Sequence, residues 1–443
     1  MTTDGITQDR STQDRSTQDR TTCAVVGGGP AGLMLGLLLA RAGVEVTVLE
    51  KHADFLRDFR GDTVHPSTLQ ALDDLGLIDR FLALPHSRVE AIRLPDPSGG
   101  APVAAVDFSR LRVPYPYIAM VPQWDLLDLL ADAAGAEPGF TLLREHEVTD
   151  VVRTGDRVTG VRYRTPQGEG SLGADLVVAC DGRWSVVRRA VGFPSRRFDV
   201  PFDVWWFKVP TSRPVGGALV PRLTPGRALV TIPREGYLQM AYLGPKGSDA
   251  ALRARGIESF RAEVAELVPE VARDVHRLAS MDDVKHLDVR LERLRRWSAP
   301  GVLCLGDAAH AMSPVGGVGV NLAVQDAIAA ARVLAAPLRS GAFRDAFPAH
   351  VVARVQARRR LPTAVIQGVQ RAMHARAIGP VVAGADGGPP VGVLRLLRRV
   401  PALSTLTARL VGVGPRPERV PVWGRRPPTP APEEGPVGRR LSP

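Results

Sequence analysis

Residues 23–32 read Cys-Ala-Val-Val-Gly-Gly-Gly-Pro-Ala-Gly, and they are the most informative part of the chain for predicting its fold. Its apolar start predicts a buried strand, and Gly27, Gly29 and Gly32 follow with the spacing G-x-G-x-x-G. In that pattern the first glycine permits a tight turn, the second lets backbone amides approach a pyrophosphate, and the third lets helix and strand pack closely. Pro30 falls in the first turn of the next helix, which tolerates a missing N–H group. The stretch predicts a dinucleotide-binding turn.

The residues that follow the turn strengthen this interpretation. Residues 31–40 form an apolar helical stretch, Gly43 ends it, and residues 44–49 predict a second strand. Glu50 comes 18 positions after Gly32, where an acidic residue can accept hydrogen bonds from ribose hydroxyls. A flexible glycine turn with an incidental glutamate is the less favoured alternative, because strand, turn, helix, strand and acid all occur in order. We expect the amides and the positive dipole end of the helix to face the phosphates.

Composition sets wider limits. The chain has 443 residues, 44% hydrophobic and 23% charged, which predicts an ordinary globular protein of two or three domains. Its net charge of +11 does not favour nucleic-acid binding, because the arginines are dispersed and aromatic residues make up only 5%. Cys23, Cys180 and Cys304 each lie in or beside a short apolar run, and we expect buried strand residues rather than disulfides. No metal site is predicted.

Two later stretches resemble a known family. Residues 180–188, Cys-Asp-Gly-Arg-Trp-Ser-Val-Val-Arg, look like the D-G-x-x-S-x-x-R motif of the para-hydroxybenzoate hydroxylase-like (class A) FAD-dependent monooxygenases. Residues 306–310, Gly-Asp-Ala-Ala-His, with Pro314 and Gly-Gly-Val-Gly-Val-Asn at 316–321, resemble that family's G-D motif and flavin loop. Together with the first turn, three motifs stand in the family's order. The resemblance covers residues 22–415 and implies FAD as the dinucleotide.

The resemblance also implies roles for individual residues. Asp307 and Gln123 would contact the ribityl chain and Arg60 the pyrophosphate, while the start of the helix at 320 would offer amides to the isoalloxazine ring. Pro314 would lie near the flavin peroxide and is the one candidate catalytic residue. His310 is interpreted as a structural histidine, and Arg183 and Arg188 as either surface charges or nicotinamide-positioning groups. The predicted cofactor-binding residues are Gly27, Gly29, Pro30, Ala31, Gly32, Glu50, Lys51, Arg60, Gln123, Asp181, Gly306, Asp307, Gly319, Val320 and Asn321.

The expected fold class is α/β with an antiparallel β insert. A Rossmann-like FAD-binding domain of the glutathione-reductase type is expected over residues 22–90, 115–192 and 284–345, and a substrate-binding sheet domain over 91–114 and 193–283. A C-terminal helical region covers 346–414, and disordered tails cover 1–21 and 415–443. In the insert, residues 203–209, 228–232 and 237–243 predict strands. Trp206, Tyr237 and Gln239 are the candidate substrate residues, although core packing is at least as favoured as substrate contact for Trp205 and Trp206. Tyr237 and Gln239 share a strand face, and Tyr242 lies on the other.

These features predict an NAD(P)H- and O₂-dependent FAD monooxygenase. By resemblance, it hydroxylates or epoxidises an aromatic or other electron-rich small molecule through a C4a-hydroperoxyflavin. NAD(P)H is the expected co-substrate, docking without a Rossmann domain of its own. Alternatives are an FAD-dependent reductase or dehydrogenase of a lipophilic substrate and a non-catalytic FAD-binding protein. A halogenase is less favoured, because Trp205 and Trp206 are adjacent rather than in a W-x-W-x-I-P signature.

The remaining expectations concern partners and location. Residues 1–22 are polar and repeat Thr-Gln-Asp-Arg three times, unlike a signal peptide. We therefore expect a cytoplasmic monomer or homodimer whose partners are an aromatic or lipophilic small molecule and O₂. The apolar-basic segment around residues 394–400 could pack on the protein or contact a membrane surface as a peripheral segment, and packing is favoured.

Overall fold

The computed structural model describes residues 20–56, 62–96, 100–211, 221–234, 236–385 and 391–427. A central sheet has the strand order β19-β20-β11-β1-β2-β8. Its strands β20, β11, β1, β2 and β8 are parallel neighbours, whereas β19 pairs antiparallel with β20. The bounds are β1 Arg20–Val26, β2 Val46–Leu49, β8 Phe140–Leu143, β11 Gly168–Ala179, β19 Ser298–Ala299 and β20 Val302–Cys304. This parallel core confirms the expected α/β fold class.

The helices nearest this sheet are buried on most of their surface. α1 (Pro30–Arg41) buries every residue from Ala31 to Ala40, and it packs on α4 (Gln123–Gly135) and α8 (Gly319–Arg339). The close approach of α1 to β8 requires glycine at position 36, because a Cβ there would lie 2.8 Å from the Phe140 ring. α8 and its preceding turn are apolar and long enough to cross a membrane, but 83% of the apolar window is buried inside the protein. A helix buried to this extent inside the protein is a core helix.

A second sheet of five antiparallel strands, in the order β14-β15-β16-β13-β17, forms the insert. One face packs on helices α6 (Asp249–Ala254) and α7 (Gly256–Leu267) through Trp205, Phe207, Met240 and Tyr242. The other face holds Trp206 and Ile232 and meets a small sheet formed by β3 (Thr63–Val64), β7 (Ile118–Met120) and β4 (Ser87–Val89). The insert's strands are β13 Phe202–Pro210, β14 Arg222–Thr224, β15 Arg227–Arg234, β16 Tyr237–Pro245 and β17 Lys285–Leu287.

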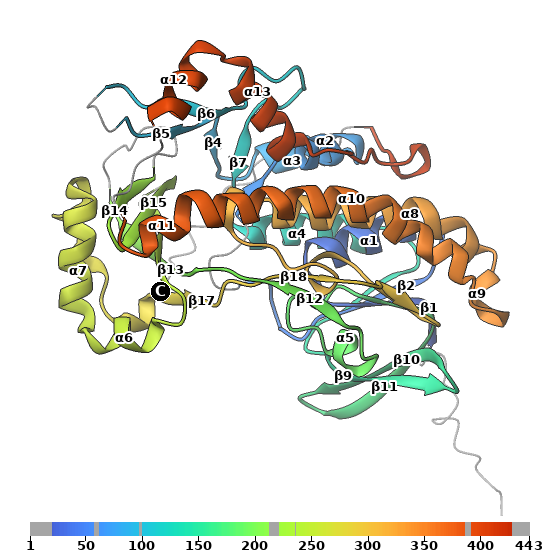
Figure 1. Cartoon of the computed structure of the whole chain (residues 1–443). Coiled ribbons are helices and arrows are strands. Elements are labelled where there is room, and N and C mark those ends of the chain that lie inside the picture. The colour runs from blue at the N-terminus through green and yellow to red at the C-terminus, as the bar shows by residue number, and fades with distance from the viewer. Residues whose placement is uncertain are drawn as a thin grey trace, which may run out of the picture.

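The remaining helices and strands lie around the two sheets (Figure 1). α10, a long helix drawn in orange, crosses the molecule beside α8, and α12 and α13 lie at the opposite end from β9–β11. The remaining strands are β3 Thr63–Val64, β4 Ser87–Val89, β5 Ala91–Leu94, β6 Val103–Asp107, β7 Ile118–Met120, β9 Glu147–Thr154, β10 Arg157–Thr165, β12 Ser195–Phe198 and β18 Leu291–Leu294. The remaining α-helices are α2 Pro66–Asp74, α3 Ile78–Leu82, α5 Val186–Ala190, α9 Ala342–Asp345, α10 Ala349–Met373, α11 Gly379–Val382, α12 Val391–Arg399 and α13 Ala402–Ala408.

Both predicted tails are too long where the structure describes them. Arg20 and Thr21 open β1 and pair with β11. After α13 the chain returns to the parallel-sheet core, where the buried Glu418 accepts hydrogen bonds of 2.6 and 2.8 Å from Arg358. Residues 415–427 therefore pack instead of forming a disordered tail, because this ion pair and the fully buried Val420, which joins the main core, anchor them. The rest of both tails lies outside the described residues.

Candidate functional site

The glycine turn after β1 has the geometry that its spacing predicts. Gly27 has φ +101°, and a Cβ there would lie 2.6 Å from the carbonyl oxygen of Cys180. A Cβ on Gly32 would lie 2.0 Å from the oxygen of Gly27, so helix and strand pack as closely as expected. At Gly29, in contrast, an added Cβ meets no atom within 4 Å, and the backbone is extended. The first and last glycines serve the fold, while the middle one faces open space that a pyrophosphate could occupy.

The start of α1 is suited to an anion. No side chain caps it, and its first turn holds no acidic residue. The buried Glu50 lies beside the turn: its Oε2 accepts from the amide of Gly28 at 2.8 Å, and its Oε1 accepts from that of His52 at 3.1 Å. Neighbouring Lys51 is exposed. Free helix amides and a fixed carboxylate are the groups that phosphates and a ribose need.

The G-D motif meets this turn from the other end of the chain. Gly306 has φ +55°, and a Cβ there would lie 3.3 Å from the Cβ of Ala323 and 3.4 Å from that of Ala31. Asp307 follows in a short 3₁₀ turn with its side chain 31% exposed. Its Oδ2 lies 3.9 Å from Arg183, which follows Asp181 and Gly182. The three motifs therefore converge within one region.

The predicted flavin loop, residues 314–319, is held by hydrogen bonds from the segment before α2, residues 63–65. Gly316 and Gly317 have φ values of +81° and +62°. The carbonyl oxygen of Gly317 accepts from the hydroxyl of Thr63 at 2.7 Å and lies 3.0 Å from Nε2 of His65. His65 is fully buried, and burial lowers its pKa to about 4. The loop is thus fixed by contacts that leave Pro314 and Val315 partly exposed.

The start of α8 offers backbone amides without a competing cap. α8 begins at Gly319, with no side-chain cap and no acidic residue in its first turn. The side-chain oxygen of Asn321 is engaged elsewhere in the protein: its Oδ1 accepts hydrogen bonds from the hydroxyls of Ser67 and Thr68, both at 2.7 Å. The predicted contact of Val320 and Asn321 with a flavin ring would therefore be made by their backbone. The Asn321 side chain instead links α8 to α2 through these hydrogen bonds.

Asp181 has a second task beside the one predicted from its motif. Its Oδ2 accepts from the amides of Val186 and Val187 at 2.8 and 3.3 Å, so it caps α5 together with Ser185. Its buried Oδ1 has no hydrogen-bond partner in the described part of the chain, and burial raises its pKa. The buried orphan oxygen leaves one acceptor, or one donor if protonated, for a ligand.

Gln123 opens α4 and joins the cofactor side to the insert. Its backbone amide donates a hydrogen bond to Oδ1 of the buried Asp62 at 3.3 Å. The other oxygen of Asp62 accepts from Arg234 on β15 at 2.7 Å, and Arg234 also donates to Gln239 at 2.8 and 3.0 Å. This buried ion pair was not foreseen from the sequence. Arg60, the predicted pyrophosphate ligand, lies outside the described residues.

The candidate substrate residues share one face of the insert. Trp206 pairs with Ala241, and Tyr237 and Gln239 alternate with Leu238 and Met240, which face α7. Tyr242 lies on the α7 side and donates to Glu263 at 2.9 Å, as the alternation predicts. Gln239 is buried and bonded to Arg234, so its carbonyl oxygen is occupied. The Nε1 of Trp206 is buried without a partner among the described residues.

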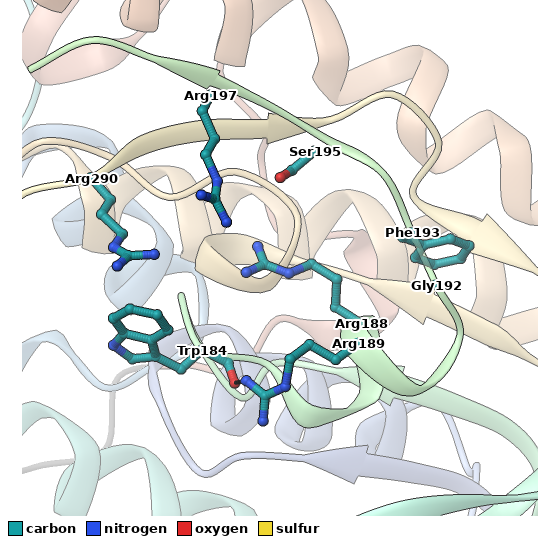
Figure 2. A pocket seen from close by; sticks show the side chains of 8 residues that line it. All are labelled: Trp184, Arg188, Arg189, Gly192, Phe193, Ser195, Arg197 and Arg290. Atoms are coloured by element: carbon teal, nitrogen blue, oxygen red, sulfur yellow. Dashed lines mark hydrogen bonds between the residues drawn. The ribbon is translucent and has the colours of Figure 1, made fainter.

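An arginine-rich hollow of about 320 Å³ lies beside the D-G motif. Figure 2 shows the side chains of Arg188, Arg197 and Arg290 directed toward one another across it. The guanidinium of Arg290 lies over the Trp184 ring, 3.8 Å from its centroid. Arg188 and Arg197 share Glu292 at 3.1 and 3.7 Å, which leaves the hollow with an excess of positive charge. An aromatic wall beside several cations suits a phosphate-bearing ligand that carries a flat ring.

A buried charged network lies under the G-D motif. Asp326 in α8 accepts from the Gly306 amide at 3.2 Å and from Nε of Arg359 at 2.9 Å, and it also pairs with Nε2 of His310. Burial alone would raise the pKa of Asp326, but His310 and Arg359 outweigh it and hold the pKa below its usual range. His310 is thus buried and paired inside this network. No pattern in the sequence indicated that Asp326 and Arg359 would be its neighbours.

These observations fit a flavin nucleotide. The fold supplies a glycine cradle open at Gly29, two uncapped helix starts, and an orphan carboxylate oxygen at Asp181. Each is a group that a dinucleotide with a flat ring would use. The residues present therefore fit FAD.

Comparisons with known proteins agree with this fit. The family model described as "FAD binding domain" matches residues 20–361. The chain is similar to the 6-methylpretetramide 4-monooxygenase of Streptomyces rimosus, with 36% identity over 343 residues that cover 74% of this chain and 79% of that protein. It is also 32% identical over 319 residues to the 12-dehydrotetracycline 5-monooxygenase/anhydrotetracycline 6-monooxygenase of Streptomyces rimosus subsp. rimosus, covering 69% of this chain and 60% of that protein.

A solved structure shows the same arrangement. The anhydrotetracycline hydroxylase from Streptomyces rimosus superposes with a TM-score of 0.67 and 25% sequence identity. The match covers 89% of this chain and 76% of that protein. The likeness thus extends beyond the cofactor turn into the insert and the C-terminal helices.

Proposed function

This chain belongs to the para-hydroxybenzoate hydroxylase-like (class A) family of FAD-dependent monooxygenases, and we propose that it hydroxylates a polycyclic aromatic small molecule with NAD(P)H and O₂. The close approach of Gly306 to Ala31, beside the open space at Gly29, carries the proposal. The substrate class is supported by the two relatives, whose names give 6-methylpretetramide, 12-dehydrotetracycline and anhydrotetracycline as their substrates.

FAD, when bound, supplies the redox chemistry by the C4a-hydroperoxyflavin route that family membership implies. The overall reaction is substrate–H + NAD(P)H + H⁺ + O₂ → substrate–OH + NAD(P)⁺ + H₂O. The protein's part is to bind, orient and exclude water. The first turn of α8 would place its positive dipole end and its amides toward negative charge on the reduced ring. Pro314 and Val315 would form the wall beside that ring.

The insert would supply the substrate side. Trp206 and Tyr237 lie on the face that turns away from α7, and the Asp62–Arg234 ion pair joins this face to the start of α4. A flat aromatic substrate between this face and the flavin loop would meet the apolar side chains of Trp206 and Ile232 beside the charged pair of Asp62 and Arg234. Epoxidation of an electron-rich double bond needs the same positioning and is distinguished only by the product.

We place the docking of NAD(P)H at the arginine-rich hollow. Its ligand must carry negative charge and a ring, and NAD(P)H carries a pyrophosphate and two rings. The hollow adjoins Arg183, which contacts Asp307, so a nucleotide there lies near the cofactor site without a Rossmann domain of its own. We also place the activity in the cytoplasm, where NAD(P)H is available; fractionation of producing cells tests this.

The decisive experiment is turnover by the FAD-loaded protein under ¹⁸O₂ with a panel of polycyclic phenols. The proposal expects substrate-stimulated NAD(P)H oxidation, with one ¹⁸O atom found in the product by mass spectrometry. Oxidation of NAD(P)H with reduced product and no ¹⁸O would instead support the alternative reductase or dehydrogenase. Tight FAD binding with no turnover on any panel member would support the non-catalytic FAD-binding protein.

A further inference from the structure

The C-terminal helix α12 leaves an apolar side uncovered. Among the described residues, eleven large hydrophobic side chains are exposed, and five of them fall within positions 391–406. Val393, Leu396 and Val400 are 45%, 50% and 40% exposed, and Leu406 in α13 is 64% exposed. A concentration of this kind in a short segment differs from the isolated apolar residues that every surface carries.

Three of these five exposed residues form a row along one side of α12 and the residue that follows it. At 3.6 residues per turn, Val393, Leu396 and Val400 fall within about 60° of one another around the axis. Leu394 lies on a different side, is 3% exposed and packs on the protein. Arg398, on that same side, donates to Asp96 at 2.6 Å. The side of α12 that carries Leu394 and Arg398 therefore contacts the protein, and the row of apolar residues is exposed to solvent.

Basic residues border this row. Arg395 and Arg399 are exposed and lie four positions apart, next to Leu396 around the helix. Residues 391–417 contain five arginines and no aspartate or glutamate. We call Val393, Leu396 and Val400, together with Arg395 and Arg399, the α12 outer face.

We propose that the α12 outer face binds the surface of an anionic lipid membrane. A helix with aliphatic residues on one side and arginines beside them lies in the headgroup boundary, with its apolar row buried and its cations toward lipid phosphates. The arginines complement the negative charge of that surface, and no acidic residue of the segment opposes it.

The composition of the face argues against a protein partner. Binding hot spots between proteins are enriched in Trp, Tyr and Arg, while Leu and Val are under-represented in them. The α12 outer face carries two arginines but no Trp or Tyr, and its apolar members are only Val and Leu. In Figure 1, α12 lies at the edge of the molecule, far from α5 and β9–β11, so the end of the molecule that carries it can approach a flat surface.

Flotation of the full-length FAD-loaded protein with vesicles tests this inference. We expect it to float with vesicles of phosphatidylcholine mixed with phosphatidylglycerol and much less with phosphatidylcholine alone, and the bound fraction should fall as salt rises. Leu396→Glu should lower the partition coefficient by about tenfold, because it removes an apolar anchor and adds like charge to the lipid. Arg399→Gln should lower it by about fivefold on the anionic vesicles only.

Leu361→Glu is the matched control. Leu361 in α10 is 63% exposed, so the same change is made on an exposed helical leucine outside the face, and flotation should stay as in the unchanged protein. Turnover of the soluble substrate should be the same in both variants. No binding to either vesicle, equal binding to both, or equal loss in both leucine variants would overturn the proposal. So would a dimer in sedimentation that Leu396→Glu dissociates, which would assign the face to a second copy of the chain.

Discussion

The hydroxyl of Thr63 donates a 2.7 Å hydrogen bond to the carbonyl oxygen of Gly317, and a Cβ added to Gly317 would lie 2.4 Å from that hydroxyl. Two segments separated by 254 positions are thus held together at the loop that we assign to the flavin. The contact leaves no room for a side chain on Gly317. The flavin loop therefore depends on the strand before α2 as much as on its own glycines.

Gly317→Ala should weaken FAD binding by at least about tenfold, because alanine at φ +62° is strained by about 1 kcal/mol and the methyl group also collides with Thr63. Gly316→Ala is the control: it has φ +81° and the same strain, but its nearest neighbour would lie 3.7 Å away. Flavin fluorescence titration of the two apoproteins measures the difference. Equal affinities would show that the Thr63 contact does not matter.

Gly29→Val should abolish FAD binding and leave the fold intact. The backbone at Gly29 suits any residue, and an added Cβ meets no protein atom within 4 Å, so only a bound pyrophosphate would be displaced. Gly32→Val should instead prevent folding, because its Cβ would lie 2.0 Å from the Gly27 oxygen. Circular dichroism and flavin content separate the two results. Stoichiometric FAD in the folded Gly29 variant would refute the assignment of the turn.

Arg359→Met should lower the free energy of unfolding by about 3–5 kcal/mol, since it leaves Asp326 charged, buried and short of a partner. The double variant Arg359→Met with Asp326→Leu should recover much of that loss, because both charges are then gone. Urea denaturation followed by circular dichroism gives the values. Additive losses in the double variant would mean that the two side chains do not act as a pair.

Acid should destabilise the protein between about pH 6.5 and pH 4, in part through His65. Burial lowers the pKa of His65 to about 4, whereas an unfolded histidine titrates near 6.5. Its contribution is therefore complete above pH 6.5 and is lost as the pH falls toward 4, at most about 3 kcal/mol. His65→Gln should flatten this part of the stability curve. His374, whose pKa burial also lowers to about 4, should keep some slope in the variant.

Arg197→Gln should raise the KM for NAD(P)H by about fivefold, as an exposed charge contact is worth up to about 1 kcal/mol. Its side chain is 77% exposed, so FAD content and stability should stay unchanged. Arg164→Gln on β10 serves as control, because its side chain is 60% exposed and lies outside the hollow. Steady-state kinetics at fixed substrate give the KM values. An equal effect in both variants would remove the hollow as the docking site.

Local patterns in the sequence were sufficient for the parallel core and the cofactor cradle. A glycine turn is readable because its residues are neighbours in the chain and its requirement is local: Gly27 needs a positive φ and Gly32 a close contact. Alternation along β16 likewise placed Tyr237 and Gln239 on one face and Tyr242 on the other. The predicted C-terminal tail began too early, since proline and arginine content gave no indication that Glu418 would meet Arg358.

Sequence patterns alone were therefore enough to predict the fold class, the family and the three motifs, because each depends on spacing within a few residues. The contacts that join the motifs became visible only in the folded chain. Asp62 and Arg234 are 172 positions apart, His310 and Asp326 meet Arg359 from another helix, and four arginines gather around Trp184. Pairs of this kind depend on how helices and sheets pack, and a single charged residue in a sequence carries no mark of the distant partner that makes its burial affordable.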